Sequence, residues 1–444
     1  KMFSWNADGT PLRFSSKGGA LAGLIFHDVS GSVEILPLGD SRFFATWPEV
    51  NFTPAQSGYD AFALEATHPS GLHLRKEYLW AGPGRMNTLR IVVSNPTRKP
   101  VTLEAWKLSL GPGLGSVPSE TDNVETLRAV ASWQEPPRKS ATVKQIKDGE
   151  HRQEWNWVAV DNRYFLASAF LSAKDFPVAT VSETQVLGNT LPLVELAAAP
   201  VELAAGGTRT WVIPFYLGPK DYVALRDMAN GLDASVDFGF FGALGKFTFR
   251  VLRGLRGVVG NYGLAIILLT VLLQCLMLPM TLKSMRTSLL MQKLQPKIQE
   301  IQKKFADDPK RMNVEMMALY KSSGTNPLGG CLPLLAQLPI FWALFTMLRN
   351  CWELHGAPFA FWIRDLSAQD PYHILPLVMG GLMFVQQRMN PAAGDPAQQK
   401  IFMFMPVMFI FMFWSFPSGL VLYWMVSSLF GILQQTLYKR YMKA

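Results

Sequence analysis

Amide and hydroxyl side chains interrupt apolar stretches in the second half of this 444-residue chain. The stretch LLTVLLQCLMLPMT, residues 268–281, carries Thr270 and Gln274 one helical turn apart on a single face. Further candidates in apolar surroundings are Gln337, Tyr423, Trp424, Ser427 and Gln434. An unpaired amide in an apolar setting costs about 1–3 kcal/mol, so we expect these groups to face one another or a water-filled cavity.

Two interpretations fit these polar groups. In the first, they form hydrogen bonds between helices, each worth about 0.6 kcal/mol, and hold a bundle together. In the second, they line an aqueous groove, which requires several converging polar groups. Glutamine and serine are compatible with both interpretations, and most of the apolar segments supply some polar side chains.

Sequence motifs for catalysis are missing, since the chain contains no GxSxG, HExxH, P-loop or CxxC. The three cysteines lie in or beside apolar stretches and lack metal-ligand spacing; they are Cys275, Cys331 and Cys351. We therefore expect small buried side chains, no disulfide framework, no metal and no cofactor. The sequence favours a protein that is not an enzyme.

The elements that carry the polar residues are apolar helices. Charged residues make up 17% of the chain, against about 25% in soluble domains, and they become rare after about residue 256. Apolar segments span about 263–282, 330–349, 372–387 and 401–438. The last would form a helix about 57 Å long, while the bilayer core is about 30 Å thick. The sequence FPSG at 416–419 therefore predicts a turn, which gives five transmembrane helices in total.

The distribution of basic residues predicts the orientation. Residues 283–328 carry nine Lys or Arg against four Asp or Glu, which makes this segment cytoplasmic, together with the 388–400 loop and the basic tail 439–444. The N-terminal half, the loop 350–371 and the FPSG turn lie outside. Because the net charge of +9 follows the predicted topology, it does not favour nucleic-acid binding.

The sequence of residues 288–327 predicts two helices that form an antiparallel hairpin. The break falls at 307–311, and Pro309 starts the second helix. The hairpin is rich in methionine, which is typical of adaptable binding surfaces. Its apolar faces either pack on each other or bind a partner, and these roles are compatible. The candidate contacts are Met291, Leu294, Pro296, Met312 and Met316.

The first half of the chain predicts an all-β domain. Runs rich in β-branched and aromatic residues at 72–80, 88–95, 101–111 and 209–218 alternate with Gly and Pro turns, which favours a large β-sandwich. A short helix at 220–232 closes it. Residues 233–260 then combine aromatic side chains with Arg and Lys at helical spacing, a pattern typical of an amphipathic helix in a membrane interface.

Several segments resemble the YidC family of bacterial membrane protein insertases. They are NYGLAIILLT (261–270), LQPKIQEIQKK (294–304), EMMALYKSSGTNPLGGCLPLLAQLPIFWALF (315–345), APFAFWIRDLSAQDPYHILP (357–376) and FPSGLVLYW (416–424). The resemblance implies a periplasmic β-supersandwich at 1–232, an interfacial helix at 233–260 and a five-helix insertase core at 261–438. It also implies a cytoplasmic hairpin at 283–328 and a hydrophilic groove open to lipid and to the cytoplasm.

The resemblance implies a function as well. Such proteins move hydrophobic segments of nascent membrane proteins from the cytoplasm into the inner membrane, alone or with the Sec translocon, and use no nucleotide. The expected partners are nascent chains, the ribosome, the Sec translocon and membrane lipids. A first transmembrane helix is expected to precede Lys1, and residues 1–30 show no signal-peptide pattern.

Gln274 departs from the family pattern. Family members usually carry an arginine in the groove at this position of the first core span, whereas this chain retains polarity without charge. An electrostatic attraction of acidic substrate segments by this residue is therefore not expected.

Two alternatives come from other functional classes. A secondary transporter or channel predicts inverted repeats and paired charges within the membrane, and the sequence displays neither. A carbohydrate-binding role of the β-domain rests on fold analogy and predicts a cleft with converging carboxylates and histidines.

Overall fold

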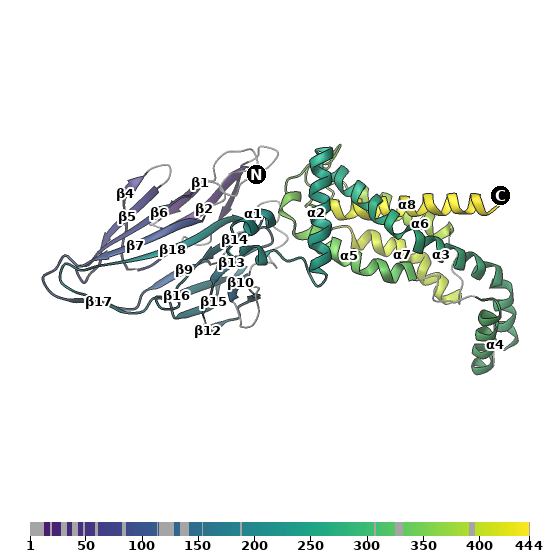
Figure 1. Cartoon of the computed structure of the whole chain (residues 1–444), viewed down its shortest axis with the longest axis horizontal. Helices are drawn as coiled ribbons and strands as arrows, with labels where there is room; N and C mark the ends of the chain where they lie inside the picture. The colour runs from purple at the N-terminus through teal and green to yellow at the C-terminus, as the bar shows by residue number, and fades with distance from the viewer. Residues whose placement is uncertain are drawn as a thin grey trace. The chain divides into compact units, whose positions relative to one another are not determined.

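The chain forms two compact units (Figure 1), Lys1–Val236 with Asn350–Glu353, and Asp237–Arg349 with Leu354–Ala444. The computed structural model describes residues 13–17, 20–27, 33–37, 43–47, 49–57, 61–81, 86–112, 114, 128–133, 142–152, 154–186, 189–305, 308–324, 332–389 and 396–443. Cys331, the hairpin residues 306–307 and 325–328, and residues 390–395 of the predicted cytoplasmic loop lie outside these ranges.

Antiparallel sheets form most of the described part of the first unit. The largest sheet has the strand order β11-β10-β13-β14-β18-β7-β6-β5-β4. Its strands are β4 (Thr53–Ser57), β5 (Ala61–Thr67), β6 (His73–Leu79), β7 (Asn87–Ser94), β10 (Arg128–Trp133), β11 (Thr142–Gln145), β13 (Trp157–Asp161), β14 (Phe165–Ala169) and β18 (Thr208–Pro219). A second sheet has the order β12-β15-β16-β9 and contains β9 (Lys107–Leu110), β12 (Gly149–His151), β15 (Val178–Val186) and β16 (Asn189–Ala197).

Two smaller sheets complete the described strands. One contains β1 (Arg13–Lys17), β2 (Ala20–His27) and β3 (Val33–Pro37), and the other pairs β8 (Val101–Leu103) with β17 (Val201–Leu203). The sequence predicts one strand over 101–111, but the structure divides this segment between β8 and β9, which belong to different sheets. The break leaves room for Trp106, whose ring is buried in the core.

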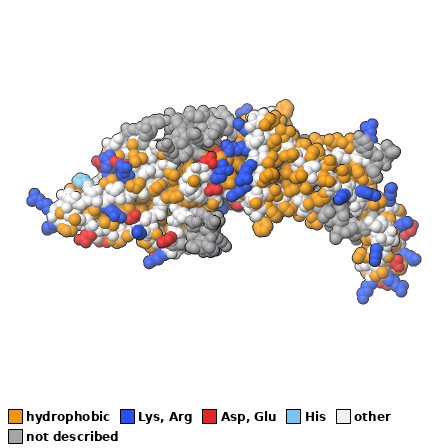
Figure 2. Space-filling model, viewed as in Figure 1, with side chains coloured by type: hydrophobic (Ala, Val, Ile, Leu, Met, Phe, Trp, Pro, Cys, Tyr) orange, Lys and Arg blue, Asp and Glu red, His pale blue; other side chains and the backbone are white. Residues whose placement is uncertain are grey.

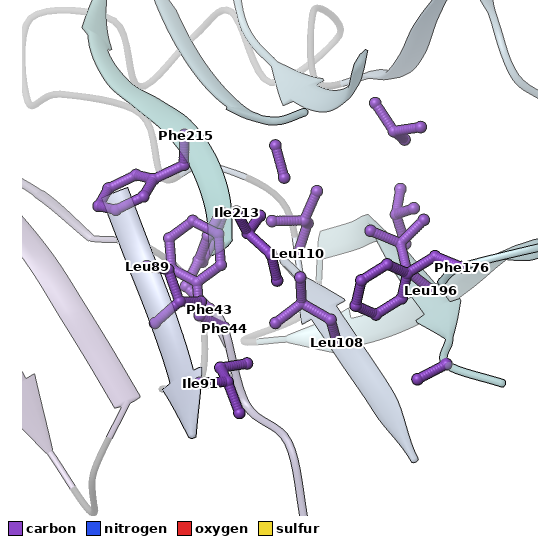
Figure 3. Close-up of a cluster of buried hydrophobic side chains, with 14 of the residues drawn as sticks. Phe43, Phe44, Leu89, Ile91, Leu108, Leu110, Phe176, Leu196, Ile213 and Phe215 are labelled. Carbon is purple, nitrogen blue, oxygen red and sulfur yellow. The ribbon is translucent and has the colours of Figure 1, made fainter. Parts of the chain in front are cut away.

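Alternating burial explains why these segments form strands around one hydrophobic core. In β6, Leu74, Lys76 and Tyr78 are buried while the residues between them are partly exposed. The central strands β13 and β14 are buried along their whole length. Figure 3 shows the core formed between side chains of the two larger sheets, among them Leu89, Ile91, Leu108, Leu110, Leu196, Ile213 and Phe215. A β-sheet-rich N-terminal domain, as predicted, precedes the helical region.

The buried side chains of Asp161 and Lys220 form an ion pair, and α1 (Tyr222–Asp227) and the 3-10 helix η3 (Leu232–Ser235) follow Lys220 in the chain. The Asp161 carboxylate accepts hydrogen bonds from Lys220 Nζ at 2.7 Å and from Arg128 Nη2 at 2.8 Å. The same unit includes Trp352, whose ring packs against those of Tyr164 and Phe165.

The second unit consists of helices α2 (Gly242–Val259), α3 (Tyr262–Lys304), α4 (Pro309–Ser322), α5 (Leu332–Asn350), α6 (Ile374–Met389), α7 (Pro396–Met412) and α8 (Ser418–Lys443). Within it, α8 packs against both α3 and α6, α2 packs against α3, and α7 packs against α6 (Figure 1). Between α7 and α8 the chain turns at 413–417, next to the predicted FPSG turn. The C-terminal residues 439–443, expected as a tail, continue α8.

Helix α3 differs most from expectation. The sequence predicts a span that ends near 282 and a separate hairpin helix from 288, whereas α3 runs for 43 residues without a break. Pro279 and Pro296 lie inside it. The Asn261 side chain caps its start by accepting a hydrogen bond from the Leu264 N–H. Asp308 caps α4 in the same way, with Pro309 in the first turn.

Candidate functional site

Leucines spaced four apart form an exposed stripe along α3, namely Leu264, Leu268, Leu272 and Leu276. On α8, Leu429, Leu433 and Leu437 repeat the pattern. Exposed apolar stripes of this kind are expected where lipid, not water, surrounds a helix. In the described part of the chain, two helical segments are long and apolar enough to cross a bilayer, Tyr262–Met291 and Ser418–Arg440. The count of five spans stays a prediction.

Hydrophobic side chains cover much of the visible face of the helical unit (Figure 2). Lys and Arg side chains gather toward α2 at one end of this cover and toward α4 and the end of α8 at the other (Figure 2). An apolar band with basic groups at its ends is the pattern expected of a helix bundle that lies in a bilayer, because Lys and Arg side chains near helix ends reach toward the interface.

Gln274 lies on the inward side of α3, about 200° around the helix from the exposed Leu272. Its Nε2 donates a hydrogen bond to the hydroxyl of Ser427 on α8. Both side chains are half-buried. The amide that interrupts the apolar stretch of α3 is therefore paired with a polar group on the neighbouring helix.

A second polar contact reaches α8 from α5. The Gln337 side chain forms a hydrogen bond with the Tyr423 hydroxyl. Tyr423 and Ser427 are four residues apart, so they share one face of α8. Gln274 and Gln337 thus approach one polar stripe of α8 from two different helices.

Thr270 and Trp424 do not join this polar set through any contact that the structure describes. The Thr270 hydroxyl is buried and donates to the Ile266 carbonyl of its own helix at 2.7 Å. Trp424 packs among aromatic rings, with centroid distances of 5.0 Å to Phe341 on α5 and 5.2 Å to Phe413 after α7. Their role as groove positions stays a prediction.

Gln434 lies two turns beyond Ser427 on the same face of α8 and is buried. Within the described residues its Nε2 has no hydrogen-bond partner. Near it, Gln386 of α6 packs on Gly431, where an added methyl group would lie 2.5 Å from the Gln386 Nε2. The close approach of α6 and α8 at Gly431 was not predicted, although a glycine between apolar residues of a membrane helix is a signal of such contacts.

The candidate hairpin contacts are only partly enclosed. On α3, Met291 and Leu294 are half-buried and Pro296 is exposed. On α4, Met312 and Met316 are half-buried, and no residue of the helix is fully buried. The exposed Val314 and Met317 extend this apolar surface.

The polar set around α8 is electrically neutral. Residues 262–282, 332–348 and 418–438 contain no Asp, Glu, Lys or Arg. Among the described residues, no group of three or more His, Cys, Asp or Glu is placed to hold a metal ion. The arrangement can bind water and polar segments by hydrogen bonding, but it offers no ion pair to a substrate.

Comparison with known proteins identifies the family. The model of the 60Kd inner membrane protein family matches residues 254–444, and the model of the YidC periplasmic domain matches residues 31–251. A membrane protein insertase YidC from Endomicrobium trichonymphae is 39% identical over 434 residues, which cover 95% of this chain and 82% of the relative. The chain belongs to the YidC family of membrane protein insertases.

A second YidC relative supports the same assignment. The insertase from Geotalea uraniireducens is 35% identical over 440 residues, covering 95% of this chain and 80% of that protein. A solved structure described as an active YidC insertase with the first transmembrane domain resolved aligns with 96% of this chain and 89% of its own at 17% identity and a TM-score of 0.43.

Membership in the YidC family establishes insertase function and an inner-membrane protein with a periplasmic domain. The transporter and carbohydrate-binding alternatives are not favoured by these matches.

Proposed function

We propose that this insertase moves hydrophobic segments of nascent proteins into the inner membrane through a groove lined by α3, α5 and α8. The observation that carries the proposal is the pair of contacts on one face of α8, Gln274 with Ser427 and Gln337 with Tyr423. Polar side chains converge there from helices that are otherwise apolar. Such convergence is what a water-filled groove requires.

The groove lowers the barrier for the polar flank of a substrate. Water held by the amides and hydroxyls shortens the apolar distance that the flank must cross, and short spans such as the 16-residue α6 thin the bilayer to the same effect. The apolar segment of the substrate then moves sideways into lipid. Its own hydrophobicity supplies the driving force, so the reaction consumes no nucleotide and requires no cofactor.

The proposed topology has five spans, α3, α5, α6, α7 and α8. The N-terminal domain lies in the periplasm and the C-terminus lies in the cytoplasm. The excess of Lys and Arg in 283–328 supports this orientation. Cytoplasmic α4 and the end of α3 receive nascent chains from the ribosome on their open apolar surface, and the insertase works alone or beside the Sec translocon.

Reconstitution tests the groove. The purified protein in vesicles is given a newly synthesised single-span substrate with a polar translocated flank, and protection of the flank from protease is measured. We expect Gln274→Leu and Gln337→Leu to reduce insertion. The lipid-facing variant Leu272→Ala serves as the control and should insert normally. Wild-type insertion by both glutamine variants would refute the groove.

Crosslinking locates the substrate. A photoreactive residue at position 274 should crosslink to nascent chains during translation, while one at position 272 should label lipid. Equal labelling of nascent chains from both positions would contradict passage along α8.

A further inference from the structure

The segment between α5 and α6 is tied to the starts of both α3 and α8. The Ser418 N–H donates to the Ala368 carbonyl at 2.7 Å, and the Gly419 N–H donates to the Leu366 carbonyl at 2.9 Å. At the start of α3, Asn261 Nδ2 donates to the Phe359 carbonyl at 3.0 Å. Both α3 and α8 contain a segment that is long and apolar enough to span a bilayer. The segment therefore lies where both enter the membrane.

Internal contacts hold this segment in one conformation. The buried Asp370 carboxylate accepts the Trp362 indole N–H at 2.9 Å and the Leu375 N–H at 2.7 Å. Leu366 and Ile363 of the same segment are buried as well. A side chain that projects from such a segment has a fixed position.

Phe361 projects from a tight turn in this segment. The Ile363 N–H donates to the Ala360 carbonyl at 3.1 Å and closes the turn. Phe361 adopts a φ of 54°, in the left-handed region that bulky residues avoid, and its side chain is 93% exposed. The fold thus holds an aromatic ring outward against both its backbone preference and its tendency to be buried.

We propose that Phe361 anchors the insertase in the lipid bilayer, with its ring inserted at the boundary between headgroups and acyl chains where α3 and α8 begin. Aromatic side chains are enriched at this depth of the membrane. The exposed Arg364 lies three residues further along and can bind the phosphates of anionic headgroups. Tyr372, which is 66% exposed, adds a second amphipathic ring on the same segment.

The surroundings of the turn at Phe361 favour lipid over a protein as the partner of the exposed ring. The helices to which it is tied expose leucine stripes, and an apolar stripe that begins at the turn continues into the depth of the bilayer. The anchor rests on the proposed topology, because it requires α3 and α8 to enter the membrane at this segment.

Spin-label depth measurements test the anchor. Cysteine-free full-length protein is placed in vesicles of phosphatidylcholine and phosphatidylglycerol and labelled at Ala360, beside Phe361. Relaxation by oxygen, which concentrates in lipid, is compared with relaxation by a water-soluble nickel chelate. Labels at Leu272 in α3 and at the exposed Ala205 of the β-domain calibrate the lipid and the water limits.

We expect the label at Ala360 to report a depth between these two limits, and Phe361→Gly to shift it to the water limit. Glycine accepts the positive φ, so this variant retains the turn. Phe361→Trp should restore the depth. The proposal is overturned if Phe361→Gly leaves the depth unchanged, or if both reagents are excluded from Ala360, which indicates a protein partner.

The Leu272 label separates failure of the anchor proposal from failure of the proposed topology on which the anchor rests. A label at Leu272 in lipid with Ala360 in water refutes the anchor alone. Labels at Leu272 and Ala360 that are both in water refute the topology and the anchor together. Insertion activity is measured separately, so loss of the proposed groove leaves the depth result intact.

Discussion

Gln274 on α3 donates its side-chain amide to the hydroxyl of Ser427 on α8, across 153 residues of sequence. Each of these helices contains a segment that is long and apolar enough to cross a bilayer. This hydrogen bond is compatible with both interpretations of the polar residues, interhelical bonding and an aqueous groove, because a bond that holds two helices together can also border water.

The energetic value of this pair follows from measurements on other membrane helices. A double-mutant cycle with Gln274→Leu, Ser427→Ala and both together should give a coupling energy of about 0.6 kcal/mol, with about 1.7 kcal/mol as the upper range. Unfolding of the protein in mixed micelles, followed by circular dichroism, measures it. Strictly additive single effects would show that the two side chains do not interact in the membrane.

Charge at position 274 should change substrate preference. In the native chain the polar set around α8 is neutral, so insertion should depend little on the sign of the charges in the substrate flank. Gln274→Arg places a cation there and should favour acidic flanks over basic ones, an effect that weakens as salt is added. Paired substrates that differ only in flank charge provide the measurement. A native protein that already prefers acidic flanks would contradict the neutral groove.

Lys76 should make the stability of the β-domain depend on pH. Burial lowers the pKa of this amine from 10.5 to about 7, and its Nζ donates to the Phe44 carbonyl at 3.2 Å. Between these values the unfolded chain binds a proton that the folded chain does not. The free energy of unfolding therefore rises with pH from about 7 to about 10.5, by at most about 1.4 kcal/mol per pH unit.

Denaturant unfolding of the full chain, followed by tryptophan fluorescence across that pH range, tests this linkage. Below pH 7 both states carry the proton and the full cost of the buried charge remains. Lys76→Met should remove the contribution to the slope, while the exposed Lys99→Met should retain it. Equal slopes in the two variants would refute the assignment.

The carboxylate of Asp161 should contribute strongly to stability. Asp161→Asn leaves the buried Lys220 without its charged partner, and loss of one member of a buried pair costs about 3–5 kcal/mol. Asp175→Asn is the matched control, because its pair with Arg209 is partly exposed and should contribute less than about 1 kcal/mol. Thermal unfolding of both variants compares them, and similar losses would contradict the role of burial.

Gly263 permits the close contact between α3 and the α5–α6 segment. A methyl group at this position would collide with the ring of Phe359, so Gly263→Ala should destabilise the protein by about 1–3 kcal/mol. At Gly254 in α2 nothing lies within 4 Å of the added atom. Gly254→Ala should therefore be neutral or stabilise by up to about 1 kcal/mol. Detergent-stable fractions after heating report both effects, and a neutral Gly263→Ala would mean that Phe359 moves freely.

Local patterns in the sequence predict where helices and strands form better than they predict which elements pack together. The runs at 72–80 and 88–95 predict β6 and β7, and Pro309 predicts the start of α4. The division of 101–111 between two sheets is not visible, because it depends on a distant core that receives Trp106.

The continuity of α3 was missed for a similar reason. Its prolines and basic residues suggest an end, but a helix tolerates proline when neighbouring groups accommodate the lost hydrogen bond. Within the site, the polarity of Gln274 could be read from sequence, whereas its pairing with Ser427 depends on tertiary packing. Trp424 packs in an aromatic cluster that includes Phe413. This contact depends on the turn between α7 and α8, so the sequence around Trp424 does not reveal it.

The unbroken course of α3 has a mechanical consequence. Its 43 residues measure about 64 Å, roughly 34 Å more than the hydrocarbon thickness. If α3 tilts about its contacts with α8, the end of the helix that extends beyond the bilayer moves furthest. Lys304 lies about 45 Å beyond Gln274 along the helix, so a tilt of about 10° at Gln274 would move it by roughly 8 Å. Helix α4 begins at Pro309, just after α3, so such a tilt would carry it along.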